Sequence, residues 1–294
     1  MIGIISYLPD DVELRNKRVV NCKEQLKWLY KVFPKEVPLV VAQNYRKEDR
    51  IDGGVYAVDY LMYDTGIGSH KARNTILDKF YASNDEWLLL LDDDVVTYDY
   101  YGADSFIVDV YYGEYNDYQF DIILPLQPET SPFKELNIKN DVAHYYVLSK
   151  SAATNCPNMM LFRHPDKDNE VWFDDTIDLL ADDAVPDDNK FIVECIVKGM
   201  KVHRADFWIK KSFDRLVSVI YSKDKDENWK QHANLGKNLA NYIINTYKVK
   251  NVAEFNKLYN KTNPVRIERE TIYTVPENLL PKKRNNVNNA KRLF

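Results

Sequence analysis

The stretch LLLLDDDVV, from Leu88 to Val96, decides the fold, because four leucines are followed at once by three aspartates and two valines. A short apolar run of this kind predicts a buried β-strand. Buried charge is costly, so the aspartates must lie where the strand leaves the core. In open α/β sheets, that carboxyl edge is where ligands bind. The alternative is an acidic turn that only closes a core strand.

The three aspartates also predict a binding chemistry. In an extended strand, successive side chains point to opposite faces, so Asp92 and Asp94 would share one side and Asp93 would take the other. Two carboxylates on one face suit a hard divalent cation with oxygen ligands. Such a cation could bridge to a diphosphate, so we predict a metal site at Asp94 and Asp92.

Apolar patterns along the first two hundred residues alternate between strands and helices, which predicts an α/β layer. Ser69 is expected to cap the second helix, and Gly199 is expected to end the third helix before a strand that carries His203. Strands are expected at residues 2–6, 38–44, 56–61, 86–91, 122–127, 143–149 and 158–163, and helices at about 19–33, 69–81 and 187–198.

The composition fits a globular chain with one large domain, or with one domain and an appendage. The hydrophobic share is 45%, and 21 Tyr and 12 Phe argue against a disordered chain. No apolar run approaches the roughly 20 residues that span a bilayer, and the acidic N-terminal segment is unlike a signal peptide. Three widely spaced cysteines predict reduced thiols, so we expect a cytoplasmic protein.

Charge divides the chain into two parts. Residues 201–294 contain 20 Lys and Arg against 9 Asp and Glu, a net charge of +11, whereas residues 1–200 contain 20 against 36, a net charge of −16, and together these give −5. This asymmetry predicts an acidic, cation-binding body and a basic end that meets an anionic partner. Two more helices are expected at 226–249 and 252–258. We therefore place a catalytic domain at 1–215 and a basic helical region with a flexible tail at 216–294.

Two further segments contribute polar side chains in a fixed order. The segment GIGSHKARN, residues 66–74, places glycines before a helix N-terminus, which suits the close approach of an anion. Arg73 lies one turn inside this helix and could bind a phosphate or a base edge. Residues 174–204 carry two acidic pairs, Asp182-Asp183 and Asp187-Asp188, and then His203.

In this order the segments resemble the GT-A glycosyltransferases, especially those like family two. The resemblance covers residues 2–210 and implies a Rossmann-like mixed sheet flanked by helices, here with a C-terminal helical, basic appendage. It also implies a nucleotide-sugar donor, with a UDP-sugar as the first choice. The donor-binding residues that it implies are Ser6, Tyr7, Gly68, Arg73, Asn74, Asp92 and Asp93.

The resemblance also implies how the reaction runs. Mn²⁺ or Mg²⁺, held by Asp94 and Asp92 with His203 as a third ligand, would stabilise the leaving diphosphate. A carboxylate would remove the proton of the acceptor hydroxyl, and we expect this base to be Asp183 or, failing that, Asp182. Such families usually show Glu-Asp here, and the second pair, Asp187-Asp188, supplies the next candidates.

The basic end suggests the acceptor. Lysines with interleaved aromatics suit a phosphate backbone and stacked bases, and the composition is similar to that of bacteriophage proteins. We therefore expect transfer to a hydroxymethylated base in phage DNA, in the host cytoplasm. Two alternatives stay open, a cell-envelope glycan transferase that docks on anionic lipid and a sugar-nucleotide-binding protein without catalysis. The DNA contacts are assigned to Trp208, Lys210, Lys211, Lys282, Lys283 and Arg284.

Overall fold

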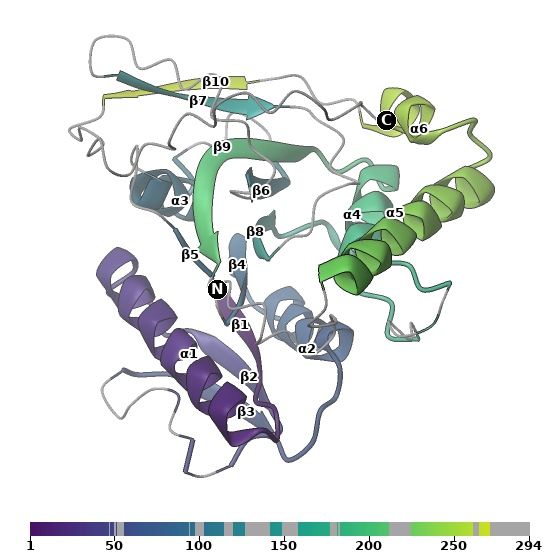
Figure 1. Cartoon of the computed structure of the whole chain (residues 1–294). Coiled ribbons are helices and arrows are strands. Elements are labelled where there is room, and N and C mark those ends of the chain that lie inside the picture. Colours follow the sequence, from purple (N-terminus) through teal and green to yellow (C-terminus); the bar gives the residue numbers. More distant parts are fainter. Residues whose placement is uncertain are drawn as a thin grey trace, which may run out of the picture.

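The fold is known from a computed structural model of the chain (Figure 1). It describes residues 1–46, 48–49, 51, 56–93, 95–97, 103–114, 120–126, 142–148, 158–176, 181, 183–211, 225–260 and 265–270. The described strands are β1 (Ile2–Tyr7), β2 (Leu39–Gln43), β3 (Asp59–Tyr63), β4 (Trp87–Asp92), β5 (Val95–Thr97), β6 (Ile122–Leu126), β7 (Val142–Leu148), β8 (Met159–Arg163), β9 (Val202–Lys211) and β10 (Val265–Glu270). The described helices are α1 (Val12–Val32), α2 (Ser69–Tyr81), α3 (Ala103–Tyr111), α4 (Asp187–Val197), α5 (Lys225–Tyr247) and α6 (Val252–Tyr259), with one 3₁₀ turn at Lys167–Asn169.

The ten described strands form one mixed sheet. Their order is β10-β7-β9-β6-β8-β4-β1-β2-β3, and β5 pairs with β9. Strand β1 pairs parallel with both β2 and β4, and β2 pairs parallel with β3. Strand β8 is antiparallel to both β4 and β6. The predicted Rossmann-like mixed sheet with flanking helices is therefore confirmed.

The run of four leucines forms the centre of this sheet. Leu89 and Leu91 pack into the cluster that includes α1 and α3, whereas Leu88 and Leu90 pack into the cluster that includes α2 and α4. All four side chains are buried, because helices cover both faces of the sheet. A strand covered on both sides reads as continuous hydrophobic sequence, which is why LLLL predicts it well.

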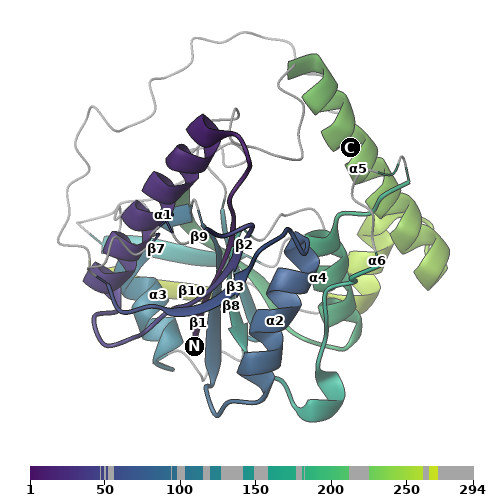
Figure 2. The same cartoon turned by 90° about the horizontal axis from the view of Figure 1, so that it is seen from below.

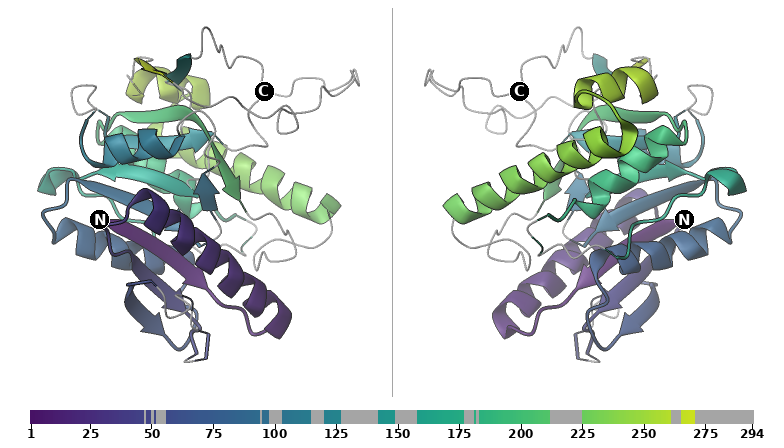
Figure 3. Two further views of the ribbon diagram at one scale, coloured as in Figure 1. Left: turned by 90° about the vertical axis from the view of Figure 1, so that its left-hand side faces the viewer. Right: turned by 90° about the vertical axis from the view of Figure 1, so that its right-hand side faces the viewer.

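The helices cover the two faces unequally. Figure 2 shows α1 and α3 on one face and α2 and α4 on the other, where α5 and α6 also lie. Buried residues of α5 and α6 (Leu239, Ile243 and Phe255) belong to the same core cluster as α2 and α4. Figure 3 shows α5 running alongside α4. None of the helices in the described ranges is long and apolar enough to span a bilayer.

The C-terminal part thus shares its core with the body. Besides α5 and α6, β10 pairs antiparallel with β7 in the main sheet. The division into 1–215 and 216–294 stays a prediction. The packing shows that residues on both sides of position 215 contribute to one hydrophobic cluster.

Two helix starts differ from the prediction. Helix α1 begins seven residues earlier than expected, where the side chain of Asp11 accepts a hydrogen bond from the Leu14 amide at 2.9 Å. Its first turns carry Arg15, which is buried in an ion pair with Asp49, so the apolar pattern does not reveal them. Gly68, and not Ser69, occupies the N-cap position of α2. Helix α3 and strand β5 were not predicted.

Candidate functional site

The carboxyl ends of β1, β2 and β4 meet at one edge of the sheet, because these strands run parallel. Asp92 is the last residue of β4. The first turns of α2 and α4 converge on the same edge, where Ser69 Oγ donates a hydrogen bond of 3.2 Å to Asp187 Oδ2. This is the edge at which open α/β sheets bind their ligands.

Arg73 of α2 joins three carboxylates at this edge. Its Nη2 donates to Asp92 Oδ1 at 3.0 Å, and its Nη1 lies 3.1 Å from Asp187 Oδ2 and 2.5 Å from Asp188 Oδ1. The residue is only 5% exposed, and its guanidinium carbon lies 5.3 Å from the centre of the Phe173 ring. One cation therefore connects the end of β4 to the first turn of α4.

The surroundings of Arg73 keep it charged. Burial by itself lowers the pKa of Arg73, but the negative charges of Asp188, Asp92 and Asp187 outweigh burial and raise the pKa above its usual value. We had expected Arg73 to bind a phosphate or a base edge. The structure gives its guanidinium three carboxylate partners instead, so Arg73 fixes the positions of these carboxylates.

Asp187 and Asp188 form the first turn of α4, where the helix dipole favours negative charge. Their side chains are 7% and 10% exposed. Asp183 is exposed and lines a pocket beside α4, and Asp182 lies outside the described residues. Within the described part of the chain, the second acidic pair is therefore the one that meets Arg73, and the base at Asp183 or Asp182 stays a prediction.

Asp93 points to the opposite face of the sheet from Asp92. Ser6 Oγ donates a hydrogen bond of 2.7 Å to Asp93 Oδ2, and Arg18 of α1 binds the other oxygen. Asp93 is 1% exposed, and this burial raises its pKa while Arg18 and Ser6 oppose the shift. The opposite directions of Asp92 and Asp93 follow the predicted alternation. Ser6 and Asp93, which we had expected to bind the donor, bind each other.

Gln25 of α1 holds the backbone of the acidic turn. Its Nε2 donates to the carbonyl oxygens of Asp92 at 2.5 Å and Val95 at 2.7 Å. Neither Gln25 nor Arg18 was predicted from the sequence to belong to the site. The sequence pattern that could have indicated them is a pair of polar residues seven positions apart, on the face of α1 that also buries Cys22. Asp94, which lies between Asp92 and Val95 in the sequence, is outside the described residues.

The loop before α2 lies against the end of β1. A Cβ atom on Gly66 would stand 3.0 Å from the Tyr7 ring, a tight contact that would require the ring to shift, so glycine suits this close approach. Gly68 has φ +89°, a left-handed conformation that glycine adopts readily. Gly68 has no side chain to cap α2, and a helix N-terminus of this kind attracts anions. Tyr7 and Gly68 therefore lie at this edge of the sheet, and their contact with a donor stays a prediction.

Asn74 has a positioning role. Its side chain exchanges two hydrogen bonds of 2.8 Å with the backbone of Phe173, one donated and one accepted. This fixes the Phe173 ring beside Arg73. The amide of Asn74, which we had expected to bind the donor, is engaged within the protein.

His203 lies away from the acidic edge. Through the pairs Leu89–Leu161, Leu161–Ile123 and Ile123–His203, it stands level with Leu89 and three strands from β4. Because neighbouring strands lie about 4.8 Å apart, His203 is about 14 Å from β4 across the sheet. Along the strand direction, it is level with a residue three positions before Asp92. It is 2% exposed and packs against Phe120, with ring centres 4.8 Å apart. We therefore withdraw His203 as a metal ligand.

The residues assigned to DNA are only partly described. The backbone of β9 places Lys211 opposite Val95 and Lys210 opposite Val96, directly after the acidic turn. The side chains of these lysines and of Trp208 lie outside what the structure describes, as do Lys282, Lys283 and Arg284.

The described residues do not complete a metal site. Among them, no group of three His, Cys, Asp or Glu side chains could hold a metal ion. Asp92 is paired with Arg73, and Asp93 is buried against Arg18. The predicted cation therefore depends on Asp94, outside the described part of the chain.

The chain was compared with known proteins. No family model and no curated protein matches it. A mannosyltransferase from Pyrobaculum calidifontis, in complex with GDP-Man and Mn²⁺, matches 88% of this chain and 67% of its own with a TM-score of 0.51 at 11% identity. TarS from S. aureus matches 85% of this chain with a TM-score of 0.46 at 14% identity, and the chain spans only 45% of TarS. The chain has the mixed α/β fold of the GT-A glycosyltransferases, as its sequence predicted.

Proposed function

We propose that this protein is a glycosyltransferase that moves a sugar from a nucleotide-sugar donor to a hydroxyl acceptor. The observation that carries the proposal is the ion-pair cluster in which Arg73 joins Asp92, at the ligand-binding edge, to Asp187 and Asp188 in the first turn of α4. The cluster joins a strand-end carboxylate and the proposed base through one buried guanidinium. The likeness in fold to a mannosyltransferase in complex with GDP-Man supports this reading.

The donor would bind along the carboxyl edge. Tyr7 offers an aromatic ring at the end of β1, next to the Gly66–Gly68 loop. The first amides of α2 suit the diphosphate, because a helix N-terminus attracts anions. Asp92 is linked to the same helix, because Arg73 of α2 donates a hydrogen bond to its carboxylate. Ser6, Asp93, Arg73 and Asn74 would act indirectly, by holding these groups in place.

We assign the general base to Asp188 in place of Asp183 or Asp182. Asp187 Oδ2 accepts from both Ser69 and Arg73, which suits a carboxylate that positions its neighbours. Asp188 would take the proton of the acceptor hydroxyl, whose oxygen would attack the anomeric carbon. The bond from that carbon to the diphosphate oxygen breaks, and the nucleoside diphosphate leaves with the electron pair. A positioned base of this kind is worth roughly 10²–10⁴-fold in rate.

The proposed transfer also depends on Mn²⁺ or Mg²⁺. Asp94 follows directly on the acidic turn that Gln25 and Arg18 support, and a cation there would neutralise the leaving diphosphate. Mn²⁺ accompanies GDP-Man in the mannosyltransferase of like fold. Loss of transfer in excess EDTA, with recovery on adding Mn²⁺, is the expected result.

The acceptor is proposed here only as a hydroxyl. The charge division of the sequence favours a hydroxymethylated base in DNA, and a cell-envelope glycan is the alternative. A sugar-nucleotide-binding protein without catalysis would also use the donor edge.

One screen separates these readings. The wild-type chain is incubated with a panel of nucleotide-sugars and Mn²⁺, alone, with oligosaccharides and with hydroxymethylated duplex DNA. Release of the nucleoside diphosphate and a mass shift of one acceptor by a sugar residue are expected. A donor that binds in titration calorimetry but is never turned over would show a binding protein instead. If no nucleotide-sugar binds at all, the proposal fails.

A further inference from the structure

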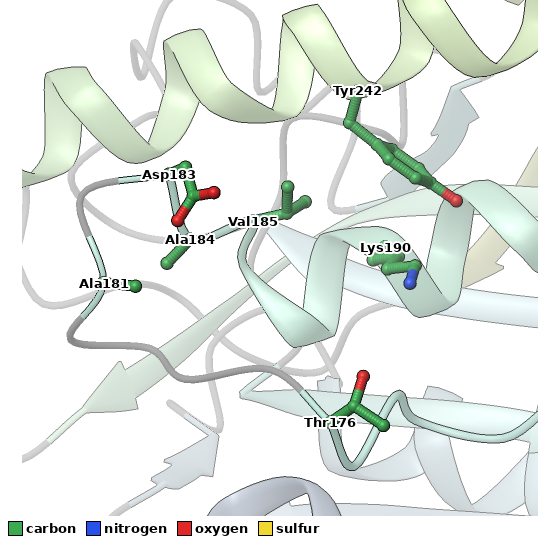
Figure 4. A pocket seen from close by; sticks show the side chains of 7 residues that line it. All are labelled: Thr176, Ala181, Asp183, Ala184, Val185, Lys190 and Tyr242. Carbon is green, nitrogen blue, oxygen red and sulfur yellow. The ribbon is translucent and has the colours of Figure 1, made fainter.

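A pocket of about 300 Å³ lies beside the acidic first turn of α4 (Figure 4). Tyr242 reaches it from α5 and Lys190 from α4, while Thr176 and Asp183 belong to the chain segments that precede α4. Its lining includes Val185, two residues before Asp187 and three before Asp188. The pocket therefore borders the segment that leads into the first turn of α4, the turn that carries the proposed base.

The pocket has a fixed shape. Asn238 of α5 donates a hydrogen bond of 3.0 Å to the carbonyl oxygen of Ala184, which ties the lining segment to the helix. Tyr242 Oη donates to Glu194 Oε1 at 3.3 Å, so its ring is held by α4. Four of the pocket's seven lining residues, Thr176, Asp183, Lys190 and Tyr242, carry polar or charged side chains, which suits a polar ligand.

The charge of the pocket argues against an anionic ligand. Lys190 is the cation of the described lining, and its ammonium pairs with Asp174 and lies 3.9 Å from Glu194. Burial by itself raises the pKa of Asp174, but hydrogen bonds from Lys190 and Thr176 outweigh it and lower the pKa to about 2. Asp174 is thus ionised at neutral pH and matches the charge of Lys190. The carboxylate of Asp183 then gives the described lining of the pocket an excess of negative charge.

The remaining groups suit hydroxyls. The carboxylate of Asp183 can only accept hydrogen bonds, which matches a ligand that carries several O–H donors. The Tyr242 ring supplies an apolar wall. A phosphate group would meet the carboxylate of Asp183, and among the described lining residues no second cation balances it, whereas a neutral polyol would not be repelled.

We propose that this pocket binds the acceptor and that the acceptor is an uncharged saccharide unit, a proposal that rests on the function proposed above. The sugar ring would lie against Tyr242 with its hydroxyls toward Asp183 and Thr176. One hydroxyl would extend past Val185 toward Asp188. DNA, whose phosphates flank every base, is the acceptor class that the pocket disfavours.

The test compares three variants with the wild type. Tyr242→Ala removes the apolar wall, and Asp183→Ala removes an exposed carboxylate without disturbing the core. Asn241→Ala, an exposed neighbour on α5 that does not line the pocket, is the matched control. An oligosaccharide array first identifies the acceptor, and the KM for that acceptor is then measured beside the donor affinity from calorimetry.

Tyr242→Ala should raise the acceptor KM by about tenfold, as the loss of one aromatic contact implies, and Asp183→Ala should raise it in the same direction. Both should leave the donor affinity within twofold, and Asn241→Ala should change neither quantity. Transfer to hydroxymethylated DNA and to no saccharide would overturn the proposal, as would an unchanged acceptor KM in both variants. If the wild type binds no nucleotide-sugar, the proposed function fails first, and that outcome is read from the donor titration alone.

Discussion

Arg73 is the residue on which the site depends. Its guanidinium is planar and always charged, and its fixed fork of donors reaches carboxylates from two different elements. Removing one partner from a buried ion pair leaves uncompensated charge, and here three carboxylates would be left together. A surface ion pair of similar length contributes far less, because water screens it.

Arg73→Gln should lower the free energy of unfolding by about 3–5 kcal/mol, the usual cost of breaking a buried pair. Arg73→Lys should restore little, because an ammonium cannot bind three carboxylates at once. Arg163→Gln is the matched control, since Arg163 Nη2 pairs with Glu86 Oε1 at 2.9 Å on the surface, and it should cost less than about 1 kcal/mol. Urea unfolding measures all three, and equal losses for Arg73→Gln and Arg163→Gln would contradict the central role of Arg73.

Lys190 should give a pH-dependent contribution to stability through Asp174. The pKa of Asp174 is lowered to about 2 in the fold, against about 3.9 for an unfolded chain. A lowered pKa means that the stabilisation is present above pH 4 and is lost as the pH falls toward 2. Lys190→Met should therefore melt below the wild type at pH 7, and the gap in melting temperature should narrow between pH 4 and pH 2. A constant gap over this range would show that the ion pair does not matter.

At the scale of elements, the sequence predicted most of the sheet because hydrophobic period and length distinguish its strands from its helices. The base could not be assigned in the same way, since two acidic pairs lie five residues apart. Only the start of α4, which brings Asp187 to Ser69 and Asp188 to Arg73, distinguishes them. His203 was misplaced because β8 and β6 lie between β4 and β9, an arrangement that local sequence does not reveal.

Gly68 and Gly199 allow a matched test of the loop before α2. Both have φ near +88°, where an L-residue is strained by about 1–2 kcal/mol. Gly68→Ala and Gly199→Ala should therefore lower the stability by similar amounts. Only Gly68→Ala should also weaken donor binding in calorimetry, because its Cβ would meet the His70 ring at 3.0 Å beside the first amides of α2. An equal loss of donor affinity in Gly199→Ala would mean that strain alone explains the effect.

For the whole molecule, one core cluster connects the acidic edge to the C-terminal helices. Leu88 and Leu90 of β4 belong to the same cluster as the buried residues of α5 and α6. The fold does not explain the charge division of +11 against −16, because most of the basic side chains lie outside the described residues. The expectation of an anionic partner therefore rests on composition and needs its own measurement.

Deleting residues 281–294 removes five positive charges and no negative ones. The deletion should weaken binding to duplex DNA and reduce its salt dependence, because each phosphate contact releases counterions. Nucleotide-sugar binding should not change. Gel-shift titrations at two salt concentrations measure both effects. If the full chain fails to bind DNA even at low salt, DNA is excluded as the acceptor, and the saccharide pocket gains support.

The most direct test of the glycosyltransferase site is the release of nucleoside diphosphate by Asp188→Asn, measured together with its donor affinity. Asparagine keeps the shape of the side chain and removes the proton acceptor. We predict donor binding close to that of the wild type and turnover reduced roughly 10²–10⁴-fold, while Asp78→Asn, an exposed carboxylate on α2, turns over normally. Normal turnover by Asp188→Asn, or a comparable loss in Asp183→Asn alone, would contradict the assignment of the site.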